Sequence, residues 1–341
     1  MSDTGFTSRE PDRIASVADQ VRSFTLASPA TAACFLGERA VFVSGEESCT
    51  FVGSDLAQQR VEVASGAILC AASDSKRVLI GTDDGQVVAL DAEGRIETVT
   101  ADAKRRWIDN VAMHGDGALA WSAGKTAFVR TRDGEIKSLD LPSTVGGIAF
   151  APKGLRLAIA HYGGATLWFP NMAAKPERLE WAGSHLGVIF SPDNRFVVTA
   201  MHEPALHGWR LADARHMRMT GYPGRVRSMV WCAGGKLLAT SGADSVILWP
   251  FGSKDGPMGK EPEMLASLRA RVSCVSAHPR ENILAAGYED GTVLLVRLAD
   301  GAEILVRANQ GDAVSALAWN AKGSRLAFAT EAGAAGLLET A

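Results

Sequence analysis

The sequence predicts an all-β protein in which a single closed β-propeller occupies nearly the whole chain. Short apolar strands alternate with tight turns, most legibly from Val226 to Phe251. This pattern occurs eight times, and successive units are 37 to 46 residues apart when aligned on the last bulky position of the first strand, at Phe35, Ala72, Met113, Phe150, Phe190, Trp231, Ala277 and Trp319. Repeats of this length with about four short strands each are typical of propeller blades.

Each unit has the same order of elements. A turn rich in Pro, Asp, Asn, Gly and Lys follows the first strand, as in Ser-Pro-Asp-Asn at 191–194. A second strand leads to another turn, where Asp84-Gly85 and Asp290-Gly291 suit a hairpin. The third strand ends in tryptophan in three central units, at Trp168, Trp209 and Trp249.

These residues give the chain a resemblance to the WD-repeat β-propeller family, over about residues 20–341. The matching motifs are Phe-Ser-Pro-Asp at 190–193, Tyr-Glu-Asp-Gly-Thr-Val at 288–293, Leu-Trp at 167–168 and 248–249, and Thr-Gly-Tyr at 220–222. The chain departs from the family in that no Trp is followed by Asp, and the family's Asp-His-Ser-Trp hydrogen-bond network cannot be assembled in any unit. It is identified as a degenerate member.

The repeat count predicts eight four-stranded blades, with seven as the alternative if residues 32–67 or 109–144 form an irregular unit. The last unit lacks a fourth strand, whereas Val21 to Ala27 is a predicted strand that precedes the first unit and belongs to none of the eight. We therefore expect this N-terminal strand to complete the last blade, which removes two exposed sheet edges. Residues 1–18 are expected to form a flexible arm, and residues 19–341 the propeller.

Composition narrows the classes of function. The net charge of −3 argues against a nucleic-acid or membrane-surface binder, and no apolar stretch is long enough for a signal peptide or a membrane span. The five widely spaced cysteines favour buried thiols in a reducing compartment. We expect a cytoplasmic protein that is a monomer on its own.

Motifs that resemble catalytic sites do not have the required context. Gly124-Lys125-Thr126 lacks the first glycine of a phosphate-binding loop and lies between two predicted strands. His202 and His207 are one residue too far apart for the zinc-protease helix motif, and Pro204 lies between them. With no catalytic motif remaining, the chain is not expected to be an enzyme.

Histidines support an alternative hypothesis. His161 and His202 each precede a blade tryptophan by seven residues, and His185 lies at the entry of the strand between them. If equivalent positions lie side by side in adjacent blades, these three imidazoles could bind zinc. The competing interpretation is that they are separate hydrogen-bonded histidines; on that interpretation the protein needs no cofactor.

Aromatic and arginine residues point to a binding face. The resemblance implies that inter-blade segments and second turns share one face of the ring, the top face. Exposed Tyr, Trp and Arg are enriched at binding hot spots, and the candidates mapped to this face are Trp107, Tyr162, Tyr222, Arg225, Arg269, Arg271 and Tyr288. Acidic residues on the same face favour a polypeptide over nucleic acid.

The leading prediction is a non-catalytic scaffold or adaptor that binds a protein or peptide on the top face or at the mouth of the central channel. The alternative is a metal- or small-ligand-binding propeller that uses His161, His185 and His202. A third possibility is an assembly subunit that binds through a blade edge. The Gly- and Pro-rich segment 252–262 is expected to be a mobile surface loop.

Overall fold

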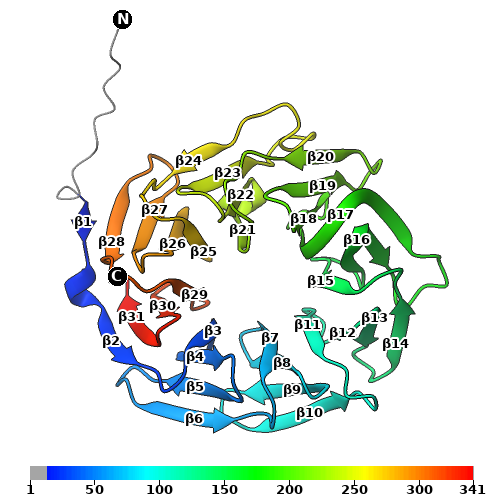
Figure 1. The fold of residues 1–341 in the computed structure, drawn as a ribbon, viewed down its shortest axis with the longest axis horizontal. Helices are drawn as coiled ribbons and strands as arrows, with labels where there is room; N and C mark the ends of the chain where they lie inside the picture. Colours follow the sequence, from blue (N-terminus) through cyan, green and yellow to red (C-terminus); the bar gives the residue numbers. More distant parts are fainter. Residues whose placement is uncertain (1–13, 341) are drawn as a thin grey trace, which may run out of the picture.

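A computed structural model describes residues 14–340, which form a closed ring of sheets arranged around a central axis (Figure 1). Short runs of β-branched and aromatic residues make the strands, and Gly, Asp and Asn make the turns between them. Among the described residues the only helices are two 3-10 turns, η2 (Ala18–Gln20) and η3 (Ala233–Gly235). Neither is long or apolar enough to cross a membrane.

The first three blades are regular antiparallel sheets with the first strand innermost. Blade 1 contains β3 (Ala30–Leu36), β4 (Arg39–Ser44), β5 (Ser48–Val52) and β6 (Gln58–Glu62). Blade 2 contains β7 (Ile68–Ser73), β8 (Arg77–Thr82), β9 (Gln86–Asp91) and β10 (Ile96–Ala101). Blade 3 contains β11 (Ile108–Met113), β12 (Leu119–Ala123), β13 (Thr126–Arg130) and β14 (Ile136–Asp140).

Blades 4 and 5 share one continuous six-stranded sheet. It contains β15 (Val145–Phe150), β16 (Leu157–Trp168), β17 (Glu177–Phe190), β18 (Phe196–Met201), β19 (Leu206–Arg210) and β20 (His216–Met219). The first half of β17 pairs with β16 as the outer strand of blade 4, and its second half pairs with β18 as the inner strand of blade 5. The seven continuous sheets therefore comprise eight blades, because six sheets hold one blade each and this one holds two.

The remaining blades close the ring. Blade 6 contains β21 (Met229–Cys232), β22 (Leu237–Thr240), β23 (Val246–Pro250) and β24 (Glu263–Leu265). Blade 7 contains β25 (Val272–Ala277), β26 (Ile283–Tyr288), β27 (Val293–Arg297) and β28 (Glu303–Arg307). Blade 8 contains β29 (Val314–Trp319), β30 (Arg325–Thr330) and β31 (Ala334–Glu339). Its fourth strand is β2 (Arg22–Thr25), which pairs antiparallel with β31.

The predicted all-β propeller and its closure by an N-terminal strand are thus confirmed, and both units suspected of irregularity are regular blades. The N-terminal segment also adds β1 (Ala15–Ser16), which pairs in parallel with the outer edge of β28. The expected arm at 1–18 lies mostly outside the described residues, and β1 is in its described part.

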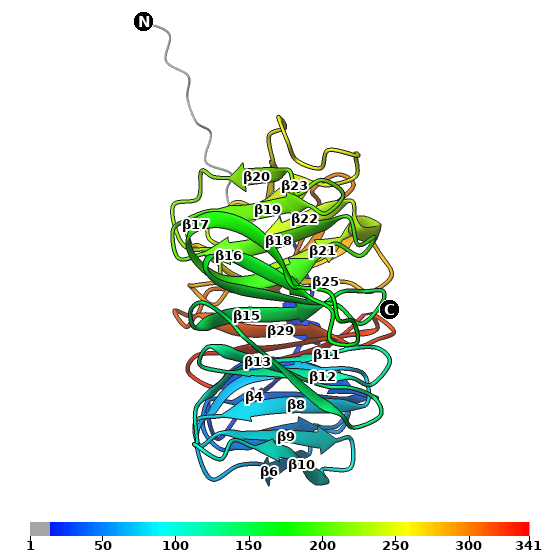
Figure 2. The same cartoon turned by 90° about the vertical axis from the view of Figure 1, so that its right-hand side faces the viewer.

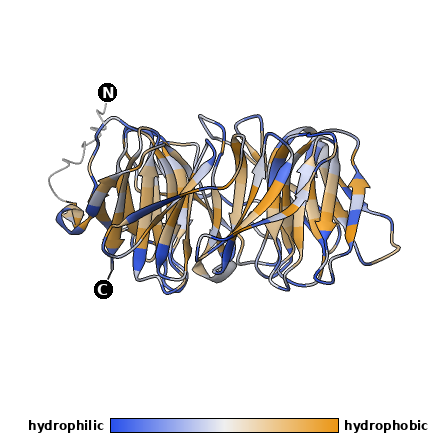
Figure 3. Ribbon diagram, turned by 90° about the horizontal axis from the view of Figure 1, so that it is seen from below, coloured by the Kyte–Doolittle hydropathy of each residue, from blue (hydrophilic) through white to orange (hydrophobic). Residues whose placement is uncertain are grey.

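Hydrophobic residues are frequent along the strands of the ring (Figure 3), and many of them are buried between blades. Eight hydrophobic clusters lie one at each junction of neighbouring blades. The cluster between blades 8 and 1 joins Leu337 and Phe42 with Leu26 of the N-terminal segment. The sheets of neighbouring blades lie next to one another (Figure 2), so each blade shares one apolar cluster with each of its two neighbours.

Candidate functional site

Backbone hydrogen bonds place the inter-blade segments and the second turns on one face, which is the top face. In four blades, the backbone amide that follows the second strand donates to the carbonyl of a residue just before the inner strand, at 2.8–3.0 Å. The pairs are Asp83 to Ala67, His202 to Ser184, Glu289 to Arg271 and Glu331 to Ala313. These acceptors come from four different blades, so the same arrangement repeats around the ring. In these blades the inter-blade segments and the second turns therefore lie together on the top face, and we call this set of turns the rim.

Three predicted residues occupy one equivalent position on this rim. Trp107, Arg225 and Arg271 each stand directly before a buried residue that opens the inner segment of a blade, Ile108, Val226 and Val272. All three are exposed, and Trp107 retains 62% of its surface. Arg271 pairs with Glu289 through Nε at 3.1 Å. Arg269, two residues earlier in the chain, is also exposed.

Tyr162 is the most exposed of the large apolar and aromatic residues described, at 67%. It lies in the middle of β16, directly after His161, and its amide donates to Ser143 Oγ at 2.9 Å. The side chain borders a pocket of about 460 Å³, whose other lining residues include Trp181, Arg178 and Glu180. The Tyr162 ring could contact an apolar group of a ligand, and the positive Arg178 and negative Glu180 in the same pocket could make polar contacts around it.

Two predicted binding residues are buried, and for them the expectation of an exposed side chain is wrong. Tyr288 is the last residue of β26 and pairs with Val272, so it does not lie in a turn. It is fully buried, and its hydroxyl donates to the carbonyl of Ala266. Tyr222 is in an inter-blade segment as expected, but its ring turns inward between blades 5 and 6.

Tyr222 belongs to a hydrogen-bonded chain. Trp249 Nε1 donates to the Tyr222 hydroxyl at 2.6 Å, and the Tyr222 and Thr240 hydroxyls are 2.7 Å apart. Thr240 donates onward to the carbonyl of Ile247 at 3.2 Å. Burial raises the pKa of Tyr222 to about 12, so the phenol stays protonated as this chain requires. A Trp-Tyr-Thr network thus ties the inter-blade segment to blade 6.

The three histidines of the metal hypothesis do not form a common site. His161 pairs with Val145 and Met201 pairs with His185, so the counterpart of His161 in the next blade is Met201. His202 is one residue further on and is exposed in the turn. The prediction that His161 and His202 are equivalent, which came from counting seven residues back from each tryptophan, is therefore wrong by one residue. A shift of one residue places a side chain on the opposite side of a strand.

The ring nitrogens of the other two histidines are already engaged. His161 Nδ1 lies 2.9 Å from the Tyr162 carbonyl, and Nε2 lies 2.8 Å from Thr166 Oγ1. His185 Nε2 lies 3.0 Å from the Trp181 carbonyl, and Nδ1 lies 2.7 Å from Thr199 Oγ1. A carbonyl can only accept, so in each ring the nitrogen beside the carbonyl is the donor. Within residues 14–340, no group of three His, Cys, Asp or Glu side chains could hold a metal ion.

The cysteines are thiols held in the core. Burial raises the pKa of Cys34 to about 11 and those of Cys49, Cys70, Cys232 and Cys274 to about 12. Nucleophilic and redox chemistry needs the thiolate. Their environment therefore favours a packing role, as the sequence predicts.

Register analysis shows three rim residues that sequence reasoning missed. In seven blades the pairing between the inner strand and the second strand shifts by one residue near the start of the inner strand. The inner-strand residue left unpaired by this shift is Leu69 in blade 2 and Leu186 in blade 5. The equivalent residue in blade 6 is Arg227, directly after Val226. Leu69 and Leu186 are 38% and 37% exposed. Leu186 and Arg227 lie four residues before the repeat anchors Phe190 and Trp231, and Leu69 lies three before Ala72, so an offset of three or four residues is the signal that the sequence contains.

Together these residues divide the top face into two sectors. Exposed apolar side chains come from blades 2 to 5, and they are Leu69, Trp107, Tyr162 and Leu186. Four exposed arginines come from the segments that enter blades 6 and 7, and they are Arg225, Arg227, Arg269 and Arg271. We call these the apolar sector and the cationic sector. Lys104 and Arg105 are also exposed, in the same segment as Trp107.

Comparisons with known proteins agree with this architecture. Residues 275–341 match the family model of the anaphase-promoting complex subunit 4 WD40 domain. No curated protein sequence matches the chain. Among solved structures, the computationally designed Ika8 protein superposes with a TM-score of 0.75 at 15% identity, covering 93% of this chain and 98% of that chain.

The C-terminal WD40 domain of Sif2 superposes with a TM-score of 0.73 at 12% identity, covering 96% of this chain and 99% of that chain. At these identities the structural likeness is one of fold. The family match in blades 7 and 8 agrees with the resemblance noted in the sequence, and the structural likeness shows that the chain has the fold of a WD40-repeat β-propeller.

Proposed function

We propose that this propeller is a non-catalytic scaffold that binds a polypeptide across the top face, at the mouth of the channel. WD40 propellers typically mediate protein binding and are usually non-catalytic. The observation that carries the proposal is the apolar sector. Nine large apolar or aromatic side chains are exposed in the described structure, and four of them are in this sector.

The rigidity of the ring favours this function. The rim turns are held by backbone hydrogen bonds and by a continuous core beneath them, so little ordering entropy is lost when a partner binds. Large exposed rings such as Trp107 and Tyr162 can then bury area at low cost.

The cationic sector suggests the composition of the partner. Arg225, Arg227 and Arg269 make no side-chain hydrogen bond or ion pair to other described residues, whereas Arg271 is paired with Glu289. We expect a partner segment with an apolar anchor for the apolar sector and acidic residues for the cationic sector. Such complementarity affects specificity and association rate more than affinity.

The test is affinity capture from the native cell with two matched variants. The first is Trp107→Ala/Tyr162→Ala/Arg225→Ala, which removes groups from both sectors of the top face. The control is Ile136→Ala/Met264→Ala, which removes exposed apolar side chains from the outer strands β14 and β24. A stoichiometric partner held by the wild type and the control but lost by the top-face variant supports the proposal.

A partner held equally by both variants would move the interface away from the top face. Thermal melting of each purified variant shows whether the fold is intact. Because all five side chains are exposed, we expect melting midpoints close to that of the wild type.

A further inference from the structure

A groove lies on the outside of the ring, beside blade 5. It runs between β20 and the segment 252–262 and has a volume of about 500 Å³. Met217, Met219 and Trp249 line its inner side, and Pro257 to Pro262 form the opposite wall. It is separate from the top face, because its residues belong to the outer strand of the blade and to the connection between β23 and β24.

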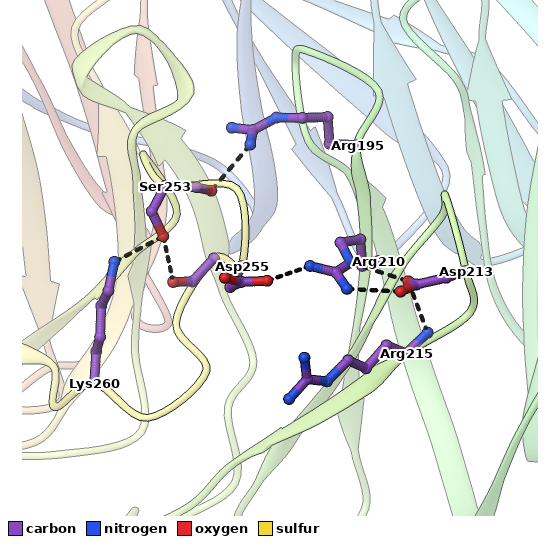
Figure 4. A network of polar contacts seen from close by, with 8 residues as sticks. Arg195, Arg210, Asp213, Arg215, Ser253, Asp255 and Lys260 are labelled. Atoms are coloured by element: carbon purple, nitrogen blue, oxygen red, sulfur yellow. Dashed lines mark hydrogen bonds and ion pairs between the residues drawn. The ribbon is translucent and has the colours of Figure 1, made fainter.

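The wall of the groove is tethered to blade 5, although the Gly- and Pro-rich composition suggested a mobile loop. Arg195 donates from Nη1 to the Ser253 carbonyl at 2.9 Å and from Nη2 to the Phe251 carbonyl at 3.2 Å. Arg210 bridges Asp213 in blade 5 and Asp255 in the segment (Figure 4). Lys260 donates to Ser253 Oγ at 2.7 Å, which closes the segment on itself. The groove is therefore preformed.

The inner side of the groove ends at an unpaired strand edge. β20 is the last strand of its sheet, next to β19. The amide of Arg210 donates to the Arg215 carbonyl, and pairing continues with Trp209 opposite His216 and His207 opposite Arg218. Because hydrogen-bonded and non-bonded pairs alternate in an antiparallel ladder, the backbone groups of His216 and Arg218 point away from β19. They are available to an added strand.

The groove has an excess of positive charge. Arg215, Arg218 and Lys260 line it, and Glu261 is the one carboxylate among the described lining residues. Arg215 and Arg218 are exposed, and their guanidinium groups make no hydrogen bond or ion pair within residues 14–340. The nearby carboxylates of Asp213 and Asp255 are both paired with Arg210. Arg215 and Arg218 at the strand edge are therefore in no ion pair among the described residues, although the charge of Arg215 helps to lower the pKa of Asp213.

The same chain shows that an outer edge of this ring accepts another strand. β1 pairs in parallel with β28, with Ala15 opposite Ile304 and Ser16 opposite Leu305. The amide of Val17 extends this ladder to the Leu305 carbonyl at 2.9 Å. In blade 7 the N-terminal segment therefore provides a fifth strand, whereas in blade 5 the corresponding edge is open and borders a groove.

We propose that this groove binds an extended acidic peptide, which adds to the free edge of β20 as a fifth strand of blade 5. Main-chain hydrogen bonds to His216 and Arg218 would supply affinity, and acidic side chains would meet Arg215, Arg218 and Lys260. Apolar side chains at alternate positions would contact Met217, Met219 and Trp249. The partner is distinguished from that of the top face by its location and by its need for a free strand edge.

The test uses fluorescence anisotropy with a labelled synthetic peptide of alternating glutamate and valine. The wild-type protein should bind it saturably, and more weakly as salt is raised. Arg215→Glu/Arg218→Glu should weaken binding about tenfold or more, because two attractions become repulsions. The matched control is Arg60→Glu on β6, an exposed arginine on the outer strand of blade 1.

Two further arms use the wild-type protein, so they do not depend on the folding of a variant. A peptide of alternating lysine and valine, and a glutamate–valine peptide N-methylated at alternate backbone amides, should both fail to bind. Hydrogen exchange should slow at His216 and Arg218 when the acidic peptide binds.

The proposal is overturned if no saturable binding occurs, or if the charge-reversed protein binds the acidic peptide as well as the wild type. It is also overturned if N-methylation has no effect, since strand addition needs those amides. Loss of the peptide in Trp107→Ala/Tyr162→Ala, with the groove variant unaffected, would assign the peptide to the top face instead.

Discussion

Replacement of His207 should remove a large part of the acid sensitivity of this protein. His207 is fully buried in β19, and neither ring nitrogen has a hydrogen-bond partner among the described residues. Its ring stacks on Trp181 with centroids 4.1 Å apart and lies 5.3 Å from His216. Burial lowers the pKa of His207 to about 3, helped by the neighbouring His216 and His185.

The sign of the effect follows from proton linkage. The folded-state pKa lies below the ordinary value of 6.5, so the unfolded chain binds more protons between these two values. Stability is therefore lost as pH falls below about 6.5, and the loss is complete near pH 3. For these two pKa values, lowering the pH from about 7 to about 5 costs about 2 kcal/mol of unfolding free energy.

The perturbation is His207→Phe, which keeps a flat ring against Trp181 and removes both unpartnered nitrogens. Urea unfolding of the wild type and the variant at a series of pH values measures the difference. The pH dependence of the variant should be shallower by about 2 kcal/mol between these pH values, and near neutral pH its stability should equal or exceed that of the wild type. His202→Gln, at an exposed histidine, is the control and should match the wild type.

A wild-type pH profile that His207→Phe leaves unchanged would refute this reasoning. So would direct titration of His207 by nuclear magnetic resonance, if its pKa were near the ordinary histidine value. A variant that is less stable at every pH would show that the nitrogens contribute hydrogen bonds that stabilise the fold. His185 also has a lowered pKa because of its burial, so some acid sensitivity should remain in the variant.

Three further predictions test the ring itself. Deletion of residues 1–28 removes β2 and its apolar contacts in blade 8, so thermal unfolding should begin lower and become less cooperative; an unchanged transition would contradict closure by this strand. Tyr222→Phe leaves Trp249 and Thr240 without their shared partner and should cost about 1–3 kcal/mol in urea unfolding; a neutral effect would show that the network is dispensable. Arg210→Ala releases Asp255, so trypsin should cleave faster at Lys254 and Lys260 than in the wild type, whereas Arg297→Ala, which breaks an exposed ion pair elsewhere, should leave the rate unchanged.

Local patterning in the sequence was enough to predict the architecture. Short apolar strands, turns of Asp-Gly and Pro-Asp, and a repeat of about forty residues are all local features, and each blade repeats them. The sequence contains one extra strand before the first unit, at Val21 to Ala27, and the last unit is one strand short. Counting the strands was therefore enough to predict that the N-terminal strand closes the ring. The positions of Trp107, Arg225 and Arg271 on one rim followed from the same register.

Side-chain environment was decided by tertiary structure. Tyr162 lies within β16 and Tyr222 lies in an inter-blade segment, and the sequence assigned both to the top face. Tyr222 is nevertheless drawn inward by Trp249 and Thr240, which come from strands further along the chain. His161 and His202 were assigned one register, and strand pairing set them one residue apart, so one is buried and the other exposed. The groove beside β20 required Arg195 and Arg210 to meet a segment more than forty positions later. Such contacts depend on distances between blades, which no local pattern encodes.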